Sequence, residues 1–272
     1  MSEPGSQPCV IFIPARYASS RYPGKPLAEL TGANGKAKTL IRRSWEAAMA
    51  VRGVDAVYVV TDDSRIGSAA CAFGAEVLMT SPDCRNGTER CAEAVQMLAH
   101  TPRIVVNLQG DAPLTPAWYV EDLIATMRDD PQVSVATPVL RSSGAHLDKL
   151  RSDRGKGLVG GTTALVDHAG NAIYFSKEVL PFTTRSYSAG EATPVLHHVG
   201  VYAYTPAALA RYMELPPGTY EILEGLEQLR FLEYGIPVRC VEVAARGHEF
   251  WELNNPSDIP IIETILRERG IE

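Results

Sequence analysis

Three cations lie close together in one short segment near the N-terminus. Residues 13–27 read IPARYASSRYPGKPL, and Arg16, Arg21 and Lys25 follow the apolar run Cys9–Ile13. Most short charged stretches are solvent-exposed, so a basic loop of no special function is the simplest interpretation. The alternative is an anion site at the end of a first strand, where clustered cations would neutralise a polyphosphate.

A carboxylate ends the segment VVNLQGD, residues 105–111, which reads as a buried strand followed by a turn. Gly110 would allow another group to approach closely, next to the carboxylate of Asp111. One carboxylate together with polyphosphate oxygens is a common way for proteins to hold Mg²⁺. The alternative is that Asp111 caps a turn or a helix before Pro113, and the segment in isolation supports both interpretations.

The segment RNGTER, residues 85–90, opens a helical pattern and contains groups that bind anions. The backbone amides and the hydroxyl of Thr88 could cap the helix or contact a ligand, and Arg90 could reach an anion. Considered alone, a capped helix start is the simpler interpretation.

Two adjacent histidines, His197 and His198, raise the question of a metal site. Neighbouring residues on a strand point to opposite faces, so one histidine could contact a ligand but both could not easily bind one ion. Tyr202 shares a face with His198 by the two-residue period, although a row of core aromatic residues would give the same pattern.

Strands and helices alternate through the first half of the chain. The segments 10–13, 56–60, 104–108 and 133–137 are typical of strands, and the segments 39–51, 63–73, 88–99 and 117–127 of helices. This rhythm predicts an α/β fold with a mostly parallel central sheet and helices on both faces. Ligands bind at the carboxyl ends of such strands, so the loops 14–27 and 109–113 are expected to face one crevice.

The second half of the chain is less regular. Strands are expected over 157–166, 196–204 and 238–243, and helices over 220–234 and 259–269. The sequence shows no internal repeat and no low-complexity linker. We therefore expect a single domain over residues 1–272, with a β-rich extension at about 140–215.

The composition is that of an ordinary globular protein of 272 residues, with 45% hydrophobic and 21% charged residues. The net charge of −6 argues against nucleic-acid and anionic-membrane partners, which require a basic face. Five scattered cysteines without a C-x-x-C pair fit neither a disulfide framework nor a zinc ribbon. With no recognisable signal peptide and no long apolar run, we expect a cytoplasmic location and no membrane partner.

Taken together, these segments resemble the cytidylyltransferases that activate 3-deoxy-manno-octulosonate (Kdo), an eight-carbon 2-keto sugar acid. The matching segments follow the family order over roughly residues 9–260: IPARYASSRYPGKPL, the stretch 61–90, VVNLQGDAPLTP, ATPV, AIYFSKEVLPF, HHVGVYAYTP and EILEGLEQLRFLEYG. The combination of RYPGKPL, QGD and GVYAY points to this family, because the related sialate-type enzymes share the opening loop only loosely.

The resemblance implies a nucleotide-diphospho-sugar transferase fold, a homodimer and a requirement for Mg²⁺. The implied reaction joins CTP to the anomeric hydroxyl of Kdo, giving CMP-Kdo and pyrophosphate. Positioning and charge neutralisation would carry this transfer, because the hydroxyl attacks the α-phosphorus in line with the departing pyrophosphate. A place in lipopolysaccharide or capsule synthesis is implied by the family only.

The resemblance also assigns roles to residues at matching positions. The CTP triphosphate contacts correspond to Arg16, Ser19 or Ser20, Arg21 and Lys25. The other nucleotide contacts correspond to Gly87, Thr88, Arg90 and Gln109, and the metal ligands to Asp111 and Asn254. Among these, Arg21, Lys25 and Asp111 are the implied catalytic residues. The sugar-side pocket corresponds to Lys177, His198, Tyr202, Glu221, Glu224 and Gln228.

Several positions depart from the family pattern. Ala112 replaces the glutamate of QGDEP, Asn254 replaces a metal-binding aspartate and Lys177 replaces an arginine. Asparagine brings no charge to Mg²⁺, so metal binding should weaken unless Glu252 or another carboxylate substitutes. An arginine could bind a carboxylate through two hydrogen bonds, whereas the ammonium group of Lys177 acts as a point charge. The remaining departures are Asn86 for a serine, Thr163 for a lysine and Ile222 for a histidine.

These departures leave two hypotheses. The first is an active cytidylyltransferase for Kdo or a modified 2-keto sugar acid, because changes within one fold often alter the substrate. The second is a catalytically weak CTP-binding homologue that acts as a sensor or partner protein.

Overall fold

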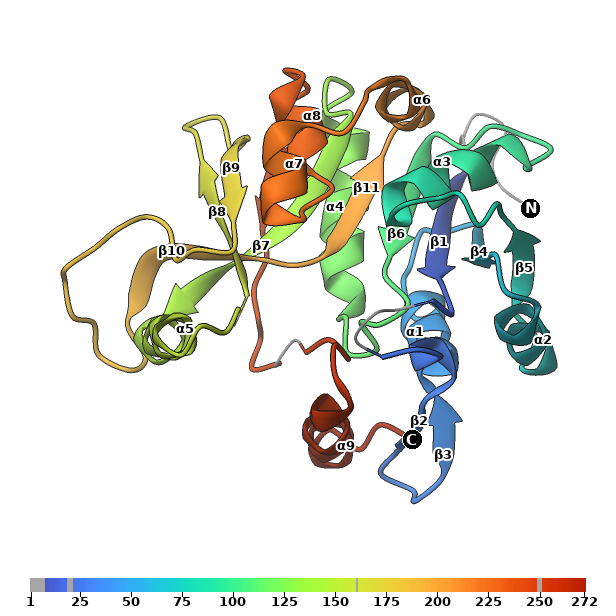
Figure 1. Ribbon diagram of the computed structural model, residues 1–272, viewed down its shortest axis with the longest axis horizontal. Coiled ribbons are helices and arrows are strands. Elements are labelled where there is room, and N and C mark those ends of the chain that lie inside the picture. The colour runs from blue at the N-terminus through green and yellow to red at the C-terminus, as the bar shows by residue number, and fades with distance from the viewer. Residues whose placement is uncertain (1–7, 19–21, 160, 249–250) are drawn as a thin grey trace. The chain divides into compact units, whose positions relative to one another are not determined.

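The computed structural model describes residues 8–18, 22–159, 161–248 and 251–272 (Figure 1). The chain divides into two compact units, Met1–Glu121 with Arg246–Glu272, and Asp122–Ala245. We call the first the N-terminal unit and the second the central unit. The single domain over residues 1–272 with its β-rich extension stays a prediction.

A parallel sheet forms the core of the N-terminal unit. β1 (Cys9–Ala15) lies between β4 (Ala56–Thr61) and β6 (Ile104–Leu108), and β5 (Glu76–Met79) pairs with β4. The residues of β1 from Cys9 to Ile13 are at most 4% exposed, as expected for strands covered on both faces. The strand positions predicted in this part of the chain and the α/β fold class are confirmed.

Helices cover the two faces of this sheet. α1 (Leu40–Met49) follows β1 and α2 (Ser64–Ala72) follows β4, whereas α3 (Gly87–Gln96) returns the chain from β5 to β6. Because crossovers between parallel strands are right-handed, α1 and α2 cover one face and α3 the other. In agreement, α1 contacts α2, and α3 packs on β1, β4 and β6.

Further helices and one pair of short strands complete this unit. The C-terminal helix α9 (Ile259–Glu268) packs beside the antiparallel pair of β2 (Glu29–Thr31) and β3 (Ala37–Thr39). Two single turns of 3₁₀ helix are η1 (Lys25–Leu27) and η2 (Pro256–Asp258), and α4 (Ala117–Asp129) continues from this unit into the next.

The central unit is built around β7 (Val135–Ser143). β10 (Ala192–His198) and β11 (Val201–Tyr204) pair with β7 in antiparallel orientation, and β12 (Arg239–Glu242) pairs with it in parallel. Two further strands extend this sheet: β8 (Thr162–Val166) pairs with β10, and β9 (Ala172–Ser176) pairs with β8. Four helices of the described chain also belong to this unit: α5 (Gly144–Gly155), α6 (Pro206–Glu214), α7 (Thr219–Glu224) and α8 (Leu229–Glu233).

A bulge interrupts the pairing of β7 with the chain that forms β10 and β11. His198 pairs with Val139 and Ala203 with Ala136, so four residues of one chain segment face two residues of β7. One of those two is Pro138, which has no backbone N–H and is tolerated where a ladder is interrupted. Bulges of this kind bend a strand and redirect its side chains.

Four helices of the described chain, α5 to α8, differ from the sequence-based predictions. The sequence predicts one helix over 220–234, whereas α7 and α8 are separated by Gly225, whose φ of +62° ends the first of them. Neither α5 nor α6 is predicted from the sequence; in α5 the buried side chains of Leu147 and Leu150 form too short an apolar stripe. None of the helices in the described part of the chain combines the length and apolar content needed to span a bilayer.

Candidate active site

The loop after β1 is shaped by Gly24. Its φ is +73°, and a Cβ atom there would lie 3.1 Å from the ring of Tyr17, so any other residue would be strained. The amide of Gly24 donates to the carbonyl of Tyr17 at 2.9 Å and closes the loop before Lys25. Arg16, at the end of β1, is exposed and accessible to a ligand.

Lys25 and Asp111 form an ion pair. Nζ of Lys25 donates to Oδ2 of Asp111 at 2.5 Å, and the two side chains are 13% and 21% exposed. The second carboxylate oxygen, Oδ1 of Asp111, is buried without a hydrogen-bond partner among the described residues. The structure therefore brings together the two loops that the sequence predicts to lie close to each other, one after β1 and one after β6.

Backbone contacts fix the carboxylate of Asp111 in place. The amide of Gly110 donates to the carbonyl of Pro14 at 3.3 Å, and a Cβ atom on Gly110 would lie only 2.8 Å from that oxygen. A side chain at this position would force the two loops apart. The amide of Leu253 donates to the carbonyl of Asp111 at 2.9 Å, which places Asn254 one residue from this contact.

The segment around Asn254 carries oxygen atoms but no complete metal cage. The side-chain amide of Asn254 donates to Glu252 at 3.4 Å, and the backbone amide of Asn254 donates to Oδ2 of Asp258 at 2.9 Å. No group of three or more His, Cys, Asp or Glu side chains able to hold a metal ion occurs in the described ranges. A metal ion here would need further ligands from a bound molecule or from water.

α3 begins as a capped helix, as the simpler interpretation of RNGTER predicts. The side-chain oxygen of Asn86 accepts a hydrogen bond from the amide of Glu89 at 2.9 Å. Arg90 is buried: its Nη1 donates to Oγ1 of Thr80 at 2.5 Å, and its Nη2 lies 3.2 Å from a carboxylate oxygen of Asp62. The guanidinium group is therefore already neutralised, and a bound nucleotide would have to compete for it.

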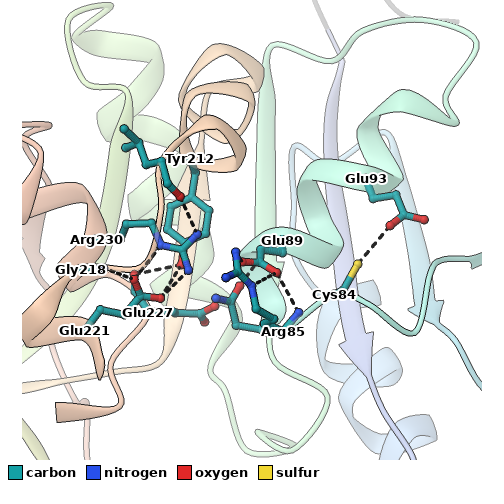
Figure 2. Close-up of polar contacts among 11 residues, drawn as sticks. Cys84, Arg85, Glu89, Glu93, Tyr212, Gly218, Glu221, Glu227 and Arg230 are labelled. Atoms are coloured by element: carbon teal, nitrogen blue, oxygen red, sulfur yellow. Dashed lines mark hydrogen bonds and ion pairs between the residues drawn. The ribbon is translucent and has the colours of Figure 1, made fainter. Parts of the chain in front are cut away.

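Figure 2 shows the polar contacts that precede and begin α3. Nη2 of Arg85 lies 2.6 Å from the carboxylate of Glu89, and the thiol of Cys84 donates to Glu93 at 3.1 Å. Burial, together with the carboxylate of Glu93, raises the pKa of Cys84 to about 12. Cys84 is thus a neutral thiol near pH 7, which excludes it as a nucleophile in this site.

Asn107 is a polar side chain enclosed within β6. It is 0% exposed, and neither Oδ1 nor Nδ2 has a hydrogen-bond partner in the described part of the chain. A Cβ atom on Gly87 would lie 3.1 Å from Nδ2, so the amide faces the first residue of α3. An unsatisfied buried amide costs free energy, and this one lies beside Gly87, a predicted nucleotide contact.

His198 is a buried, uncharged histidine of the central unit. Its Nε2 lies 2.9 Å from Oγ1 of Thr137, and its ring lies 4.9 Å from that of Phe175 and 5.6 Å from that of Tyr202, measured between centroids. Burial, assisted by the adjacent His197, lowers the pKa of His198 to about 3. Near pH 7 the ring can donate and accept hydrogen bonds but does not contribute a positive charge.

Tyr202, whose ring lies near that of His198, contacts Gln228. The hydroxyl of Tyr202 donates to Oε1 of Gln228 at 3.1 Å. Gln228 is 1% exposed, and its Nε2 is buried without a hydrogen-bond partner among the residues that the structure describes. Gln228 therefore contributes a buried, uncharged donor that no protein group satisfies among the described residues.

Glu224 organises the end of β9. Its carboxylate accepts from the hydroxyl of Ser176 at 2.7 Å and from the backbone amide of Lys177 at 3.0 Å. Nζ of Lys177 lies 3.1 Å from the position of a Cβ atom on Gly225, so this glycine makes room for the ammonium group. The predicted sugar residues Lys177 and Glu224 are thus brought together.

Glu221 forms a buried, bidentate ion pair with Arg230 (Figure 2). Nε and Nη2 of Arg230 donate to the two carboxylate oxygens at 2.7 and 2.6 Å. The hydroxyl of Tyr212 and the amide of Gly218 also donate to this carboxylate, at 3.3 and 3.2 Å. The hydrogen-bonding capacity of Glu221 is therefore largely used inside the protein, which favours a role in positioning the α7–α8 segment.

Comparison with known proteins places the chain in a family. Residues 10–242 match the family model described as cytidylyltransferase. The 3-deoxy-manno-octulosonate cytidylyltransferase of Maricaulis maris (strain MCS10) is 43% identical over 258 residues, which are 95% of this chain and 96% of that protein. The chain belongs to the 3-deoxy-manno-octulosonate cytidylyltransferase family.

Two further relatives are similar to this chain over most of its length. The 8-amino-3,8-dideoxy-manno-octulosonate cytidylyltransferase of Shewanella sediminis (strain HAW-EB3) is 38% identical over 94% of this chain and 97% of its own length. The solved structure of a CMP:2-keto-3-deoxy-manno-octonic acid synthetase, in complex with CTP, is 35% identical with a TM-score of 0.81, covering 96% of this chain and 99% of that one. The predicted nucleotidyltransferase fold and enzyme class are confirmed.

Within this cytidylyltransferase fold, the predicted site residues fall into two sets. The N-terminal unit carries the nucleotide and metal set: Arg16, Lys25, Gly87, Thr88, Arg90, Gln109, Asp111 and Asn254. The central unit carries the sugar set: Lys177, His198, Tyr202, Glu221, Glu224 and Gln228. Ser19, Ser20 and Arg21 lie outside the described residues. The ligand contacts of all these residues stay predictions.

Four residues that the sequence does not single out lie against predicted site residues: Asn107, Thr137, Tyr212 and Arg230. Asn107 and Thr137 belong to VVNLQGD and ATPV, two segments that the sequence analysis uses. A polar residue inside an otherwise apolar strand is the signal that could have indicated them. Arg230 gives no such signal, because a charged residue in a helical segment is normally exposed.

Proposed function

We propose that this protein transfers CMP from CTP to the anomeric hydroxyl of Kdo, or of a closely related 2-keto-3-deoxy sugar acid, with release of pyrophosphate. The pairing of Lys25 with Asp111 beyond the ends of β1 and β6 carries the proposal, in a chain that belongs to the Kdo cytidylyltransferase family. The carboxyl ends of parallel strands are where α/β sheets bind ligands.

The chemistry requires little more than alignment and charge neutralisation. The anomeric oxygen forms a bond to the α-phosphorus of CTP, the bond from that phosphorus to pyrophosphate breaks, and the hydroxyl proton passes to solvent. Arg16 and Lys25 would neutralise the negative charge that builds on the leaving group, with Arg21 in its predicted role beside them. The phosphates would then compete with Asp111 for the ammonium group of Lys25.

The residues present fit a Mg²⁺ ion that is bound together with the nucleotide. Oδ1 of Asp111 is a buried carboxylate oxygen without a hydrogen-bond partner in the described ranges, and oxygen atoms are the ligands that Mg²⁺ prefers. Asp111 would hold the ion, and Asn254 or Glu252 would add an oxygen ligand. When bound, Mg²⁺ supplies positive charge that offsets the charge of the phosphates.

The homodimer, the cytoplasmic location and a place in lipopolysaccharide or capsule synthesis remain parts of the proposal. Large apolar side chains of the central unit are exposed, among them Ile173 at 59%, Phe182 at 86% and Leu223 at 76%. A second copy of the chain would cover such side chains in a homodimer. Analytical ultracentrifugation at several protein concentrations measures this assembly state.

Pyrophosphate release tests the proposed function directly. The purified protein is incubated with CTP and Mg²⁺ alone, with Kdo, and with 8-amino-3,8-dideoxy-manno-octulosonate, the acid in the name of the Shewanella sediminis relative. We expect release only when CTP and one of the sugar acids are both present. The second candidate, a catalytically weak CTP-binding protein, is favoured by the uncharged Asn254 at a predicted metal-binding position. It would be supported if CTP raised the melting temperature while neither sugar acid elicited release.

Replacing Asn107 by leucine is expected to stabilise the protein and to impair nucleotide binding. Leucine has a similar shape and removes two buried polar atoms without partners, so the free energy of unfolding should rise by about 1–3 kcal/mol. If the amide serves the bound nucleotide, the KM for CTP should rise about tenfold, the effect of one lost hydrogen bond. Urea unfolding and initial-rate kinetics measure the two effects.

Asn171→Leu is the matched control. The oxygen of Asn171 accepts a hydrogen bond from Nε of Arg239 at 3.0 Å, so its replacement should destabilise the protein and leave the KM for CTP unchanged. A destabilised Asn107→Leu protein, or one with an unaltered KM for CTP, would contradict the interpretation of Asn107.

A further inference from the structure

Thr137 occupies a buried position beside the bulge between β10 and β11. It is 0% exposed, and its Oγ1 lies 2.8 Å from the carbonyl oxygen of Val201, 3.3 Å from that of Val199 and 2.9 Å from Nε2 of His198. The next residue, Pro138, has no amide proton to offer. The hydroxyl of Thr137 is therefore the β7 donor placed to reach the carbonyls of the bulge.

The position of one proton follows from these three contacts. A threonine hydroxyl has a single proton to donate and can accept through its lone pairs. The carbonyls of Val201 and Val199 can only accept, so the proton of Thr137 points to them. Nε2 of His198 must then donate to Oγ1, and this is possible only in the tautomer that carries its proton on Nε2. The opposite tautomer would sacrifice one of these hydrogen bonds, which corresponds to about a tenfold change in the tautomer ratio.

The other ring nitrogen of His198 is left as an acceptor. The ring stays uncharged near pH 7, because burial beside Phe175 and Tyr202 disfavours the imidazolium form. Nδ1 of this tautomer carries a lone pair, and the only hydrogen bond of the ring within the described ranges is the one from Nε2. Nearby, Nε2 of Gln228 is a buried donor without a partner in the same part of the chain. An uncharged acceptor and an uncharged donor match hydroxyl groups better than they match a carboxylate.

We propose that Thr137 is a positioning residue that holds His198 as the Nε2–H tautomer, so that Nδ1 accepts a hydrogen bond from a hydroxyl group of the sugar acid. The part of this proposal that concerns the sugar acid rests on the proposed function. The bulge is what makes this arrangement possible, because it turns the carbonyl of Val201 toward a side chain of β7. The hydroxyl of Thr137 thus contacts both the bulge of the sheet and the histidine that is proposed to bind the sugar acid.

The tautomer is measured without any ligand. In protein labelled with ¹⁵N in its histidines, long-range ¹H–¹⁵N correlation spectra distinguish protonated from unprotonated ring nitrogens, and His198→Gln assigns the signals. We expect the Nε2–H form in the wild-type protein and in Thr137→Ser, which keeps the hydroxyl. Thr137→Val keeps the shape but removes the hydroxyl, and its His198 should shift toward the Nδ1–H form. An unchanged tautomer in Thr137→Val would overturn the proposal.

Kinetics provide the second readout. The KM for Kdo should rise about tenfold in Thr137→Val, as expected for one weakened hydrogen bond, while the KM for CTP stays within about twofold. Thr137→Ser should recover most of the loss. Thr193→Val is the matched control, because Thr193 in β10 is also buried, at 2% exposed, and its hydroxyl donates to the carbonyl of Ser142 at 2.9 Å rather than to a histidine.

The two readouts separate the inference from the proposed function. If the wild-type protein uses no sugar acid, the proposed function fails, and the ligand-free spectra still decide the tautomer. If Thr137→Val changes the tautomer but leaves the KM for Kdo unaltered, the hydrogen bond to the substrate is wrong while the transferase activity stands. If Thr137→Val does not fold, the spectra of the wild-type protein and of Thr137→Ser provide the test. A His198 ring in the wild-type protein with its proton on Nδ1 would refute the proposal.

Discussion

Replacing Asp111 by asparagine is expected to lower kcat/KM for CTP by about 10²–10³-fold, the scale on which loss of one preorganised charge-stabilising group reduces turnover. Asparagine keeps the shape and one oxygen but removes the negative charge that faces Lys25 and that would bind Mg²⁺. The free energy of unfolding should fall by about 1–3 kcal/mol, because the two side chains are 13% and 21% exposed and the pair is only partly buried. Pyrophosphate release and urea unfolding measure the two quantities.

Asp129→Asn controls for the removal of a negative charge, because Asp129 is exposed at the end of α4. It should change kcat/KM by less than about twofold. Lys25→Met, alone and combined with Asp111→Asn, completes a double-mutant cycle that measures the coupling between the paired side chains. An Asp111→Asn protein with kcat/KM within about threefold of the wild-type value would exclude this carboxylate as the metal ligand.

Arg230→Met should destabilise the protein by about 3–5 kcal/mol, because it leaves the buried carboxylate of Glu221 without its partner. The arginine side chain is 1% exposed and that of Glu221 10%, so water cannot replace the lost hydrogen bonds. The aromatic ring of Tyr212 also loses the guanidinium group that lies 3.9 Å from its centroid. Urea unfolding followed by circular dichroism measures the loss.

The exposed pair of Arg211 and Glu214 provides the control for Arg230. Its side chains are 57% and 65% exposed, so Arg211→Met should cost less than about 1 kcal/mol. A loss below about 1 kcal/mol for Arg230→Met would show that Glu221 is not held by this pair. Glu221 would then be free to contact the sugar acid, as the family resemblance implies.

The layout of the N-terminal unit could be predicted because hydrophobic periodicity is a local property. The apolar run Cys9–Ile13 forms β1, the run Ile104–Leu108 forms β6, and the segment after Asn86 forms the capped helix α3. The division between α7 and α8 was not predicted. It depends on the left-handed conformation of Gly225, which a helical pattern on both sides conceals.

The candidate site was predicted less completely than the fold. The sequence indicated Lys25 and Asp111 through their residue types and their places after strands, but it could not indicate that they pair with each other. The assignment of Glu221 to the sugar stays a prediction, and the structure adds that its carboxylate pairs with Arg230. Asn107 stands out in the sequence only as a polar residue in an apolar strand, and the sequence does not show that its amide lacks partners among the described residues.

The sequence by itself determined the chemistry that is available: cations after the first strand, a carboxylate after β6, and aromatic and amide side chains in the second half. Tertiary structure decided which of these groups face each other. Lys25 meets Asp111 across 86 residues, and Thr137 meets His198 across 61, through a bulge that no local pattern predicts. The reason is physical, because hydrogen bonds and ion pairs depend on distance, angle and burial, and only the folded chain sets these for residues far apart in sequence.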